Sequence, residues 1–408
     1  MCGFTAQVFG RECSADPEDI ENLVTCSKRL SARGPNEFGI FSRQSCSAIH
    51  YRLPIIDIDG SSQQPFFDSK LNVLVLFNGC IYNFKEKRSE LIKKGYEFYS
   101  EGDTEVVAKL YHCYREGFTK HIEGIYSIFI FDFDLNISTL ARDRFGVKPL
   151  YYFLRKDVFL ISSDIRCLLR HPSCAISLNL FSICSYSMLH SIVPSPDTLF
   201  NEIRRVSPGE LMQVQFGKVI WSGKTETKGQ PPGSREFVES EFYDILQSAI
   251  LKQTVSDAEL SVLLSGGLDS SLIAAILAES GVNFETYSIG FPDTKEEVGN
   301  EFEYSDQVVT TLGMPHTKII VSEHEIWENI TSSVHLMMEP MASHDCVAFF
   351  LLGKEVGRRH RVTICGQGAD EVFGGYHWHN KISEDVDFFK QYESLFFDHP
   401  IRLSLIHI

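Results

Sequence analysis

The residues with the clearest chemical potential follow a short apolar run at 262–264, in the order Ser265-Gly266-Gly267-Leu268-Asp269-Ser270-Ser271. Helix-forming residues come next, so the pattern predicts a strand, a glycine turn and a helix N-terminus. Such a turn gathers unpaired backbone N–H groups and the positive end of a helix dipole, where an anion can bind. The Asp269 carboxylate would repel a phosphate unless a divalent cation lay between them. No Gly-Lys-Ser/Thr follows, which excludes a Walker A loop. A plain turn between core elements is the alternative.

Cys2 is the second candidate for chemistry. Removal of Met1 would leave Cys2 as the N-terminus, with its thiol beside its own α-amine. An α-amine has a pKa of about 7.7–8.0 and is a usable base at neutral pH. A terminal nucleophile with its own amine as base is an established activation scheme. Taken alone, a cysteine at position 2 is more often incidental.

Hydrolysis of an amino-acid amide by a thiol needs an oxyanion hole and groups of both charges for the substrate. Asn78-Gly79, after an apolar run at 73–77, offers a side-chain amide and a backbone N–H for the oxyanion. Arg52 offers a bidentate cation for a carboxylate, and Asp103, next to a glycine, an anion for an ammonium group. Each has an alternative interpretation: Asn-Gly is usually a hairpin turn, and single charged residues usually face solvent.

The elements that must position these residues differ between the two halves of the chain. The first half predicts mainly short strands with few helices. Residues 48–58 are expected to form a strand pair interrupted at Pro54, and the strand at 73–77 is expected to stop at Asn78. Further strands are expected at 125–133, 138–142, 150–154 and 158–162, and helices at 19–30, 86–94 and 104–114.

A polar, Gly- and Pro-rich segment at 222–236 predicts a linker between domains at 1–221 and 237–408. After it, a helix at 237–252 and strands near 262–264, 284–290, 316–321 and 360–365 alternate with helical segments, including one that opens at 303–306. This alternation is typical of a parallel sheet covered on both faces. Asp370, in the loop after the last strand, is a second magnesium candidate, or else a helix cap. The histidines at 344, 377 and 379 are not arranged as a four-ligand metal site.

Composition narrows the class of protein. The 408 residues predict two domains, and the formal charge of −16 argues against nucleic acid or an anionic membrane as a general partner. No apolar run is long enough for a transmembrane helix, and the N-terminus does not have the pattern of a signal peptide. The eleven scattered cysteines fit free thiols in a reducing cytoplasm.

Several motifs together resemble the class II glutamine amidotransferase domain and, further along, the synthetase domain of a glutamine-hydrolysing asparagine synthetase. The first domain carries Met1-Cys2-Gly3-Phe4, Arg33-Gly34-Pro35, Tyr51-Arg52-Leu53, Asn78-Gly79-Cys80-Ile81-Tyr82-Asn83, Gly102-Asp103-Thr104-Glu105 and Arg142-Asp143-Arg144-Phe145-Gly146-Val147-Lys148-Pro149-Leu150-Tyr151-Tyr152. The second carries residues 265–271 and Gly366-Gln367-Gly368-Ala369-Asp370-Glu371-Val372-Phe373-Gly374-Gly375-Tyr376.

The resemblance implies an α+β N-terminal-nucleophile hydrolase sandwich, with stacked antiparallel sheets between helices, followed by an α/β parallel-sheet domain of the adenine nucleotide alpha-hydrolase-like type. It implies glutamine hydrolysis at Cys2, with Asn78 and Gly79 as the oxyanion hole and Arg52, Asn78, Gly79, Cys80 and Asp103 binding glutamine. It also implies that ATP and Mg²⁺ activate an acceptor carboxylate as an acyl-adenylate, which ammonia then attacks. The implied ATP site comprises Leu263, Ser265, Gly266, Gly267, Asp269, Ser270, Ile289, Cys365 and Gly366, with Gln367 near the adenylate and Asp269 and Asp370 on the metal.

Three features depart from that family. Cys80 stands where the family usually has a glutamate that helps to hold glutamine, and Gln367 where it usually has a glutamate near the adenylate. Third, the sequence after Tyr376 does not match the family's further helices, so a truncated synthetase domain is expected. Aspartate is one expected acceptor. Motifs around 78–83, 339–345 and 366–378 also resemble the subgroup that amidates N-acetylglutaminylglutamine.

Two other functions stay open at this point. A glutaminase-only or regulatory protein would have an unproductive synthetase domain and would release no AMP with any carboxylate. A free-standing nucleotide hydrolase would turn over ATP without glutamine and would leave the first 220 or so residues unexplained. The sequence also leaves a homodimer open.

Overall fold

The computed structural model describes residues 2–10, 15–58, 60–189, 191–225, 238–293, 300–341, 343 and 345–376. Two compact units divide the chain: Met1–Ser182 with Pro194–Ala258, and Ile183–Val193 with Glu259–Ile408. The predicted linker lies largely outside the described residues, as do His344, the histidines at 377 and 379 and the end of the chain. The domain boundary at 222–236 stays a prediction.

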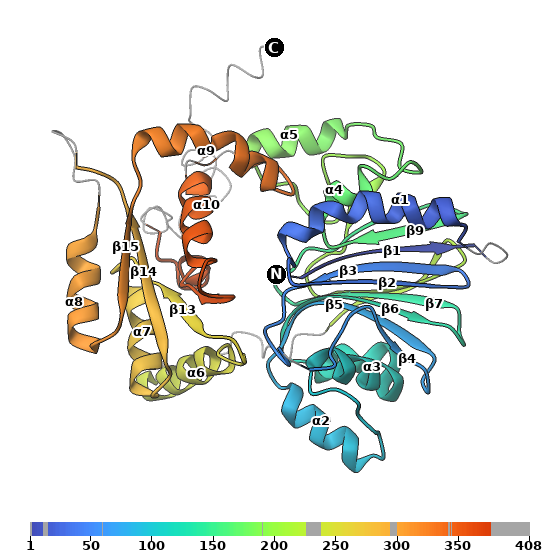
Figure 1. Cartoon of the computed structure of the whole chain (residues 1–408), viewed down its shortest axis with the longest axis horizontal. Coiled ribbons are helices and arrows are strands. Elements are labelled where there is room, and N and C mark those ends of the chain that lie inside the picture. Colours follow the sequence, from blue (N-terminus) through green and yellow to red (C-terminus); the bar gives the residue numbers. More distant parts are fainter. Residues whose placement is uncertain are drawn as a thin grey trace, which may run out of the picture. The chain divides into compact units, whose positions relative to one another are not determined.

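The first unit contains two six-stranded antiparallel sheets, ordered β10-β8-β9-β1-β3-β2 and β12-β11-β7-β6-β5-β4 (Figure 1). The strands of the first sheet are β1 (Gly3–Phe9), β2 (Glu37–Arg43), β3 (Cys46–Arg52), β8 (Tyr151–Leu154), β9 (Val158–Ser162) and β10 (Ile203–Arg205). Those of the second are β4 (Phe66–Asp68), β5 (Val73–Ile81), β6 (Gly124–Asp132), β7 (Ile137–Arg142), β11 (Glu210–Gln215) and β12 (Lys218–Lys224).

Side chains of β5 point alternately to the two faces of the second sheet, and both faces are buried. Leu74 and Leu76 belong to an apolar cluster with Phe4 of the other sheet, whereas Val73 and Val75 pack into a second cluster that includes residues of α3. Helix α3 (Asp103–Tyr114) covers the outer face of the second sheet, and α1 (Pro17–Ser27) covers that of the first (Figure 1). The predicted sandwich between helices is therefore present.

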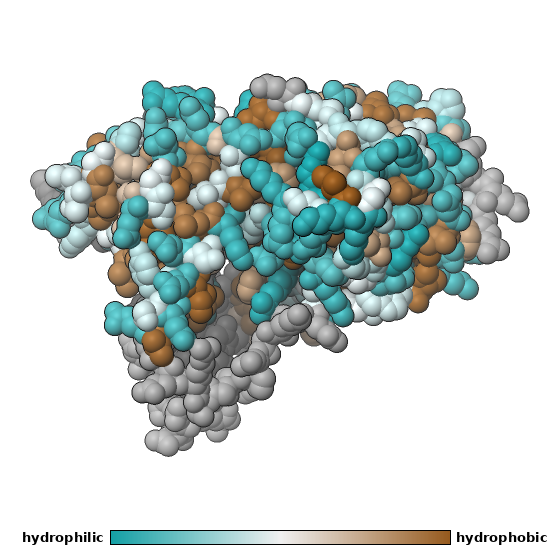
Figure 2. Space-filling model, turned by 90° about the horizontal axis from the view of Figure 1, so that it is seen from below, coloured by the Kyte–Doolittle hydropathy of each residue, from teal (hydrophilic) through white to brown (hydrophobic). Residues whose placement is uncertain are grey.

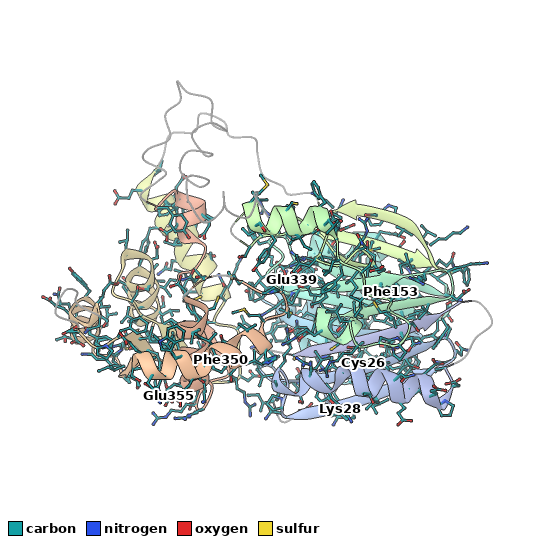
Figure 3. All side chains as sticks on the ribbon, turned by 90° about the horizontal axis from the view of Figure 1, so that it is seen from above. Cys26, Lys28, Phe153, Glu339, Phe350 and Glu355 are labelled. Carbon is teal, nitrogen blue, oxygen red and sulfur yellow. The ribbon has the colours of Figure 1, made fainter. Side chains whose placement is uncertain are left out.

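Helix α1 begins at a capping box, in which the Asp16 side chain accepts from the Asp19 N–H and the Asp19 side chain from the Asp16 N–H. Cys26 near its end is buried, whereas Lys28 is exposed, and Phe153 lies in the interior of the unit (Figure 3). The remaining helices of this part are α2 (Phe84–Lys93), α4 (Ile165–Leu168), α6 (Glu239–Lys252) and the 3₁₀ turns Lys28–Ala32 and Arg115–His121, whereas most of α5 (Leu180–Met188) belongs to the second unit.

Two strand predictions were wrong. Strand β5 does not stop at Asn78 but continues to Ile81, because it pairs with β6 along its whole length as far as Ile81 opposite Gly124. Asn78-Gly79 is therefore part of a strand and not a turn. The predicted strand pair at 48–58 is only β3, which ends at Arg52, and the following residues form a loop whose carbonyls bond to the Arg52 side chain.

The second unit contains a four-stranded parallel sheet in the order β15-β14-β13-β16. The chain moves outward from β13 to β15 and then returns to the other side of β13, so that β13 and β16 flank a topological switch point. Ligands of open α/β sheets bind outside the carboxyl ends of such strands. The elements are β13 (Leu260–Leu263), α7 (Leu268–Glu279), β14 (Phe284–Gly290), α8 (Phe302–Leu312), β15 (His316–Ile320), α9 (Glu323–Leu336), α10 (Asp345–Val356), β16 (Val362–Ile364) and α11 (Ala369–Phe373).

Helix α10, which carries Phe350 and Glu355 (Figure 3), packs on this sheet through Leu352 and Val356 against Tyr287. In the face of the molecule shown in Figure 2, hydrophobic side chains occur as separate patches among hydrophilic ones, as on ordinary protein surfaces. Within the described part of the chain, no helix has the length and apolar character needed to cross a bilayer.

Candidate active site

Cys2 lies directly before β1 and is fixed by backbone groups. Its neighbour Gly3 pairs with Tyr51 of β3, which brings Cys2 beside the end of that strand. The Leu53 N–H donates to Cys2 Sγ at 3.3 Å, and Sγ–H donates to the Leu53 carbonyl oxygen at 3.6 Å. Arg33 Nε donates to the Cys2 carbonyl at 3.1 Å. Burial raises the pKa of the thiol, so the group is protonated at neutral pH and requires a base before it can attack.

Arg52, the last residue of β3, is buried and makes several bonds. Nη1 donates to both carboxylate oxygens of Glu37 at 3.0 Å, and Nη2 donates to the carbonyls of Ile56 and Asp57 at 2.9 and 3.1 Å. The guanidinium therefore holds the loop that follows β3. Its charge also acts on the Cys2 thiol, where it favours the thiolate.

Asn78 and Gly79 lie in β5, in the other sheet of the sandwich. Asn78 is almost fully buried, and its Nδ2 lies 3.4 Å from Ser127 Oγ on β6. A Cβ atom at Gly79 would lie 2.1 Å from the carbonyl oxygen of Ile125, so only glycine fits this close approach. Glycine is usually unfavourable in a buried strand. Here the close approach of β6 leaves no room for a side chain at position 79.

Asp103 is the first residue of α3, and its Oδ2 accepts from the Ile81 N–H at 3.1 Å. This bond ties the helix to β5 just past Asn78-Gly79. Burial raises the pKa of Asp103 to about 6, although backbone N–H donors and the charge of Arg52 oppose the rise. The charge of Asp103 also acts on Cys2, so Cys2, Arg52 and Asp103 lie within electrostatic range of one another.

Cys80 is buried, and its Sγ–H donates to the carbonyl oxygen of Val255 at 3.6 Å. The same segment bonds to the loop after β3, because the Asp57 N–H donates to Asp257 Oδ2 at 2.7 Å. Burial raises the pKa of Cys80, so it is a neutral thiol. A family glutamate at this position would place a charge where this chain has a neutral group.

The motif at 142–152 mainly builds a loop. Arg142 donates to the carbonyls of Gly146, Lys148 and Val206, and Asp143 accepts from the N–H groups of Phe145, Val147 and Lys148, among others. The loop brings Lys148 into electrostatic range of Cys2 and Cys80, and burial lowers the pKa of that lysine.

Sequence reasoning assigned no role to several residues around Cys2. Arg33 and Lys148 belong to recognised motifs, but their type alone gave no reason to expect a hydrogen bond from Arg33 to Cys2 or a charge of Lys148 near it. The Leu53 backbone and Glu37 carry no chemical signal in the sequence, because their roles arise from strand pairing.

The second site is a cavity of about 710 Å³ in the second unit, at the carboxyl ends of β13, β14 and β16. Every residue predicted for ATP, adenylate or metal lines it except Gly266. The predicted residues along its wall are Leu263, Ser265, Gly267, Asp269, Ser270, Ile289, Cys365, Gly366, Gln367 and Asp370. Tyr287, Ser288 and Phe349 also line it and were not predicted.

Gly266 instead shapes the loop from outside the cavity. It has φ +87°, and a Cβ atom there would lie 2.5 Å from Tyr304 Cβ and 2.7 Å from the Ser305 nitrogen. The loop is further held by serines: Ser265 Oγ lies 3.0 Å from Ser270 Oγ and accepts from the Gly267 N–H at 3.2 Å. No side chain caps the first turn of α7, so its N–H groups are available to an anion in the cavity.

Asp269, in the first turn of α7, and Asp370, in α11, both line this cavity, although Asp370 was expected in a loop. Magnesium usually takes one or two carboxylates together with substrate phosphates, and this donor set fits that chemistry. Within the described ranges, no group of three or more His, Cys, Asp and Glu residues could hold a metal alone. Nucleotide phosphates would therefore have to complete the coordination.

Comparison with known proteins gives two family matches. A glutamine amidotransferase domain model matches residues 1–224, and an asparagine synthase model matches residues 241–405. The chain is 28% identical over 379 residues to asparagine synthetase [glutamine-hydrolyzing] 1 of Bacillus subtilis, covering 92% of this chain and 59% of the relative. It is 27% identical over 407 residues to putative asparagine synthetase [glutamine-hydrolyzing] 2 of Methanocaldococcus jannaschii, covering 93% and 76%.

Among solved structures, glutamine phosphoribosylpyrophosphate amidotransferase from B. subtilis, complexed with ADP and GMP, aligns with a TM-score of 0.37 at 16% identity, covering 75% of this chain and 70% of that one. The chain spans 59% and 64% of the length of the two B. subtilis synthetases that it matches. The chain belongs to the glutamine-hydrolysing asparagine synthetase family, with a glutamine amidotransferase domain followed by an asparagine synthase domain.

Proposed function

We propose that this chain hydrolyses glutamine at Cys2 and uses the ammonia, with ATP, to amidate an acceptor carboxylate. The observation that carries the proposal is the placement of Cys2. Its thiol is held by both backbone groups of Leu53, within electrostatic range of Arg52 and Asp103. Hydrolysis of an amino-acid amide requires a cation for the substrate carboxylate, an anion for its ammonium group and a nucleophile, and this site offers all three.

Loss of Met1 is the activating step in this proposal. The thiol is protonated because burial raises its pKa, and the free α-amine of Cys2 would accept its proton. The thiolate then attacks the amide carbon of glutamine, and the oxyanion binds to Asn78 Nδ2 and the Gly79 N–H. Ammonia leaves with the proton held by the amine. Water hydrolyses the resulting thioester, which releases glutamate and the thiol.

Arg52 and Asp103 would select glutamine by its two charges. Nη2 of Arg52 is occupied by loop carbonyls, so the glutamine carboxylate would take the place of Glu37 at Nη1. Asp103 would accept the substrate ammonium when ionised. Cys80 contributes a neutral wall to this site.

In the second unit, the 265–270 loop and the N-terminus of α7 would bind the ATP phosphates, with adenine toward Ile289 and Cys365. Asp269 and Asp370 would hold a magnesium ion, which would neutralise phosphate charge. The acceptor carboxylate would attack the α-phosphate of ATP and release pyrophosphate, and Gln367, which lines the same cavity, would donate to the resulting adenylate. Ammonia then displaces AMP.

The names of the relatives make aspartate the first acceptor to test. N-acetylglutaminylglutamine is the second, on the motif similarities around 78–83 and 366–378. AMP release that requires one of these carboxylates would identify the acceptor. No AMP with either, together with glutamine hydrolysis, would indicate a glutaminase-only protein.

Intact mass of the purified chain tests the glutaminase half directly. After incubation with the glutamine-analogue electrophile diazo-oxo-norleucine, we expect a chain without Met1 and a single adduct at Cys2. Cys184 and Cys365, which are exposed, serve as internal controls because they lack the glutamine-binding groups. A retained Met1, or an adduct spread over the exposed cysteines, would contradict the proposal.

Asp103→Asn should remove the part of the pH dependence of kcat/KM for glutamine that comes from protonation of Asp103. Asp103 has a pKa of about 6 in the folded chain, so its carboxylate is lost as pH falls through 6. Since kcat/KM reports the free enzyme, wild-type kcat/KM for glutamine should show an extra tenfold loss per pH unit below about 6. Asp103→Asn should lower kcat/KM about 10²-fold at pH 8 and lack the extra loss, because a charged hydrogen bond is removed.

Asp103→Asn should also be more stable than the wild type at alkaline pH. The folded pKa of Asp103 is raised, so stability present at low pH is lost as pH rises through about 6. A rise of about two pKa units corresponds to up to about 3 kcal/mol. Asp103→Asn should therefore raise the Tm at pH 8 and change it little at pH 4. Glu101→Gln, an exposed neighbour, is the control, and equal behaviour of the two variants would contradict the assignment.

A further inference from the structure

We propose that His50 is a positioning residue for glutamine hydrolysis, which fixes the strand carrying Asn78-Gly79 relative to the strand that follows Cys2. The inference rests on the proposed function of Cys2. It assigns to His50 neither contact with substrate nor proton transfer.

His50 connects the two sheets of the sandwich. It belongs to β3 in the first sheet, where it pairs with Phe4 of β1, two residues after Cys2. Its side chain is completely buried, and Nε2 lies 3.1 Å from the carbonyl oxygen of Phe77 in β5 of the second sheet. A carbonyl oxygen can only accept, so Nε2 carries the proton and donates. The ring also stacks on Phe4, with centroids 6.5 Å apart and an interplanar angle of 12°.

Phe77 needs such a partner because of where β4 ends. Strand β4 pairs with β5 only from Val73 to Val75, so the side of β5 facing β4 is open beyond Val75. The Phe77 N–H on that side donates to Gln64 Oε1 at 2.7 Å, and its carbonyl accepts from His50. Buried backbone groups are nearly always paired, and here two buried side chains complete the pairing.

The position of this bond matters for catalysis. Much of the packing between the sheets comes from apolar side chains such as Phe4, Leu74 and Leu76, whose contacts have no preferred direction. An oxyanion hole requires its donors at 2.7–3.1 Å from the developing charge, and a misplacement of about 1 Å can lower a rate about 10²-fold. A directional bond at Phe77, directly before Asn78, fixes the oxyanion donors against the sheet that carries the nucleophile.

The surroundings of His50 argue against a role as general base. The Cys2 thiol bonds to Leu53 and not to an imidazole. Burial, together with the charge of Arg52, lowers the pKa of His50 to about 3, and the bond to Phe77 only partly offsets this, so the ring is neutral throughout the working range. The role that remains for His50 is to donate its Nε2–H to the carbonyl oxygen of Phe77.

The test compares His50→Leu, which removes the donor, with His50→Gln, whose amide can still donate to Phe77, in the full chain lacking Met1. We expect kcat for glutamine hydrolysis to fall about 10²-fold in His50→Leu with KM within about threefold, and at least about tenfold recovery in His50→Gln. His171→Leu, which removes another buried histidine of the first unit, should keep the wild-type kcat.

Alkylation of Cys2 by iodoacetamide needs no oxyanion hole. Its rate therefore distinguishes displaced oxyanion donors from a less reactive Cys2 thiol. The alkylation rate should be the same in wild type and His50→Leu. Wild-type kcat in folded His50→Leu, or an alkylation rate that falls in parallel with kcat, would overturn the inference. If His50→Leu does not fold, His50→Asn replaces it, because its shorter amide does not reach Phe77; equal kcat in the Asn and Gln variants would overturn the inference equally. Absence of glutaminase activity in the wild type would instead refute the proposed function.

Discussion

Replacement of Cys2 by alanine is expected to lower the rate of glutamine hydrolysis by at least about 10³-fold, as removal of a covalent nucleophile does in other hydrolases. The surrounding contacts should survive, because Arg33 binds the Cys2 carbonyl and β1 pairs with β3 through backbone groups. The variant should therefore fold normally and still bind glutamine. Glutaminase assays with matched thermal melts check both points.

Ammonia provides the decisive control for this variant. If the second unit makes an amide, Cys2→Ala should support that synthesis with added ammonia at the wild-type rate, because the nucleophile only generates ammonia. Cys113→Ala, which removes another half-buried cysteine of the first unit, should keep full glutaminase activity. Glutamine hydrolysis by Cys2→Ala at the wild-type rate would rule out Cys2 as the nucleophile.

The cavity proposed to bind nucleotide was predictable because its residues cluster in the sequence. A serine- and glycine-rich turn between an apolar run and a helix forms a local structure, and the alternation of strands and helices brings the ends of β13 and β16 together. Gly266 was predicted to bind ATP for the same reason, but it does not line the cavity. A glycine inside such a loop suggests contact with a ligand, whereas its hydrogen atom faces Tyr304 and Ser305 of α8.

The proposed glutaminase site was less predictable, since its geometry depends on pairing between distant strands. Asn78-Gly79 has the composition of a turn, but β6 extends the strand through it, and this long-range pairing overrides local preference. His50 has the composition of an ordinary core residue, and its bond to Phe77 depends on where β4 stops. Neither the length of β4 nor the partners of β5 can be derived from local sequence patterns.

Gly266→Ala should weaken ATP binding by at least about 10²-fold. At φ +87°, an alanine is strained by roughly 1–3 kcal/mol, and its Cβ would also overlap Tyr304 and the Ser305 backbone at the start of α8. Relief of this overlap must move either the loop or the helix, and Ser305 is fully buried, so the loop should move. Ser265 and the first turn of α7 then lose the arrangement that would hold the phosphates.

Gly281→Ala separates strain from overlap, because Gly281 also has a positive φ, of +69°, but nothing lies within 4 Å of a Cβ placed there. It follows the other end of α7, away from the cavity. We expect both variants to lose some thermal stability, and only Gly266→Ala to lose ATP binding in calorimetric titrations of the full chain. Wild-type affinity in Gly266→Ala would mean that the loop binds nucleotide in another conformation, and the serine contacts described for it would then not be those that organise the bound phosphates.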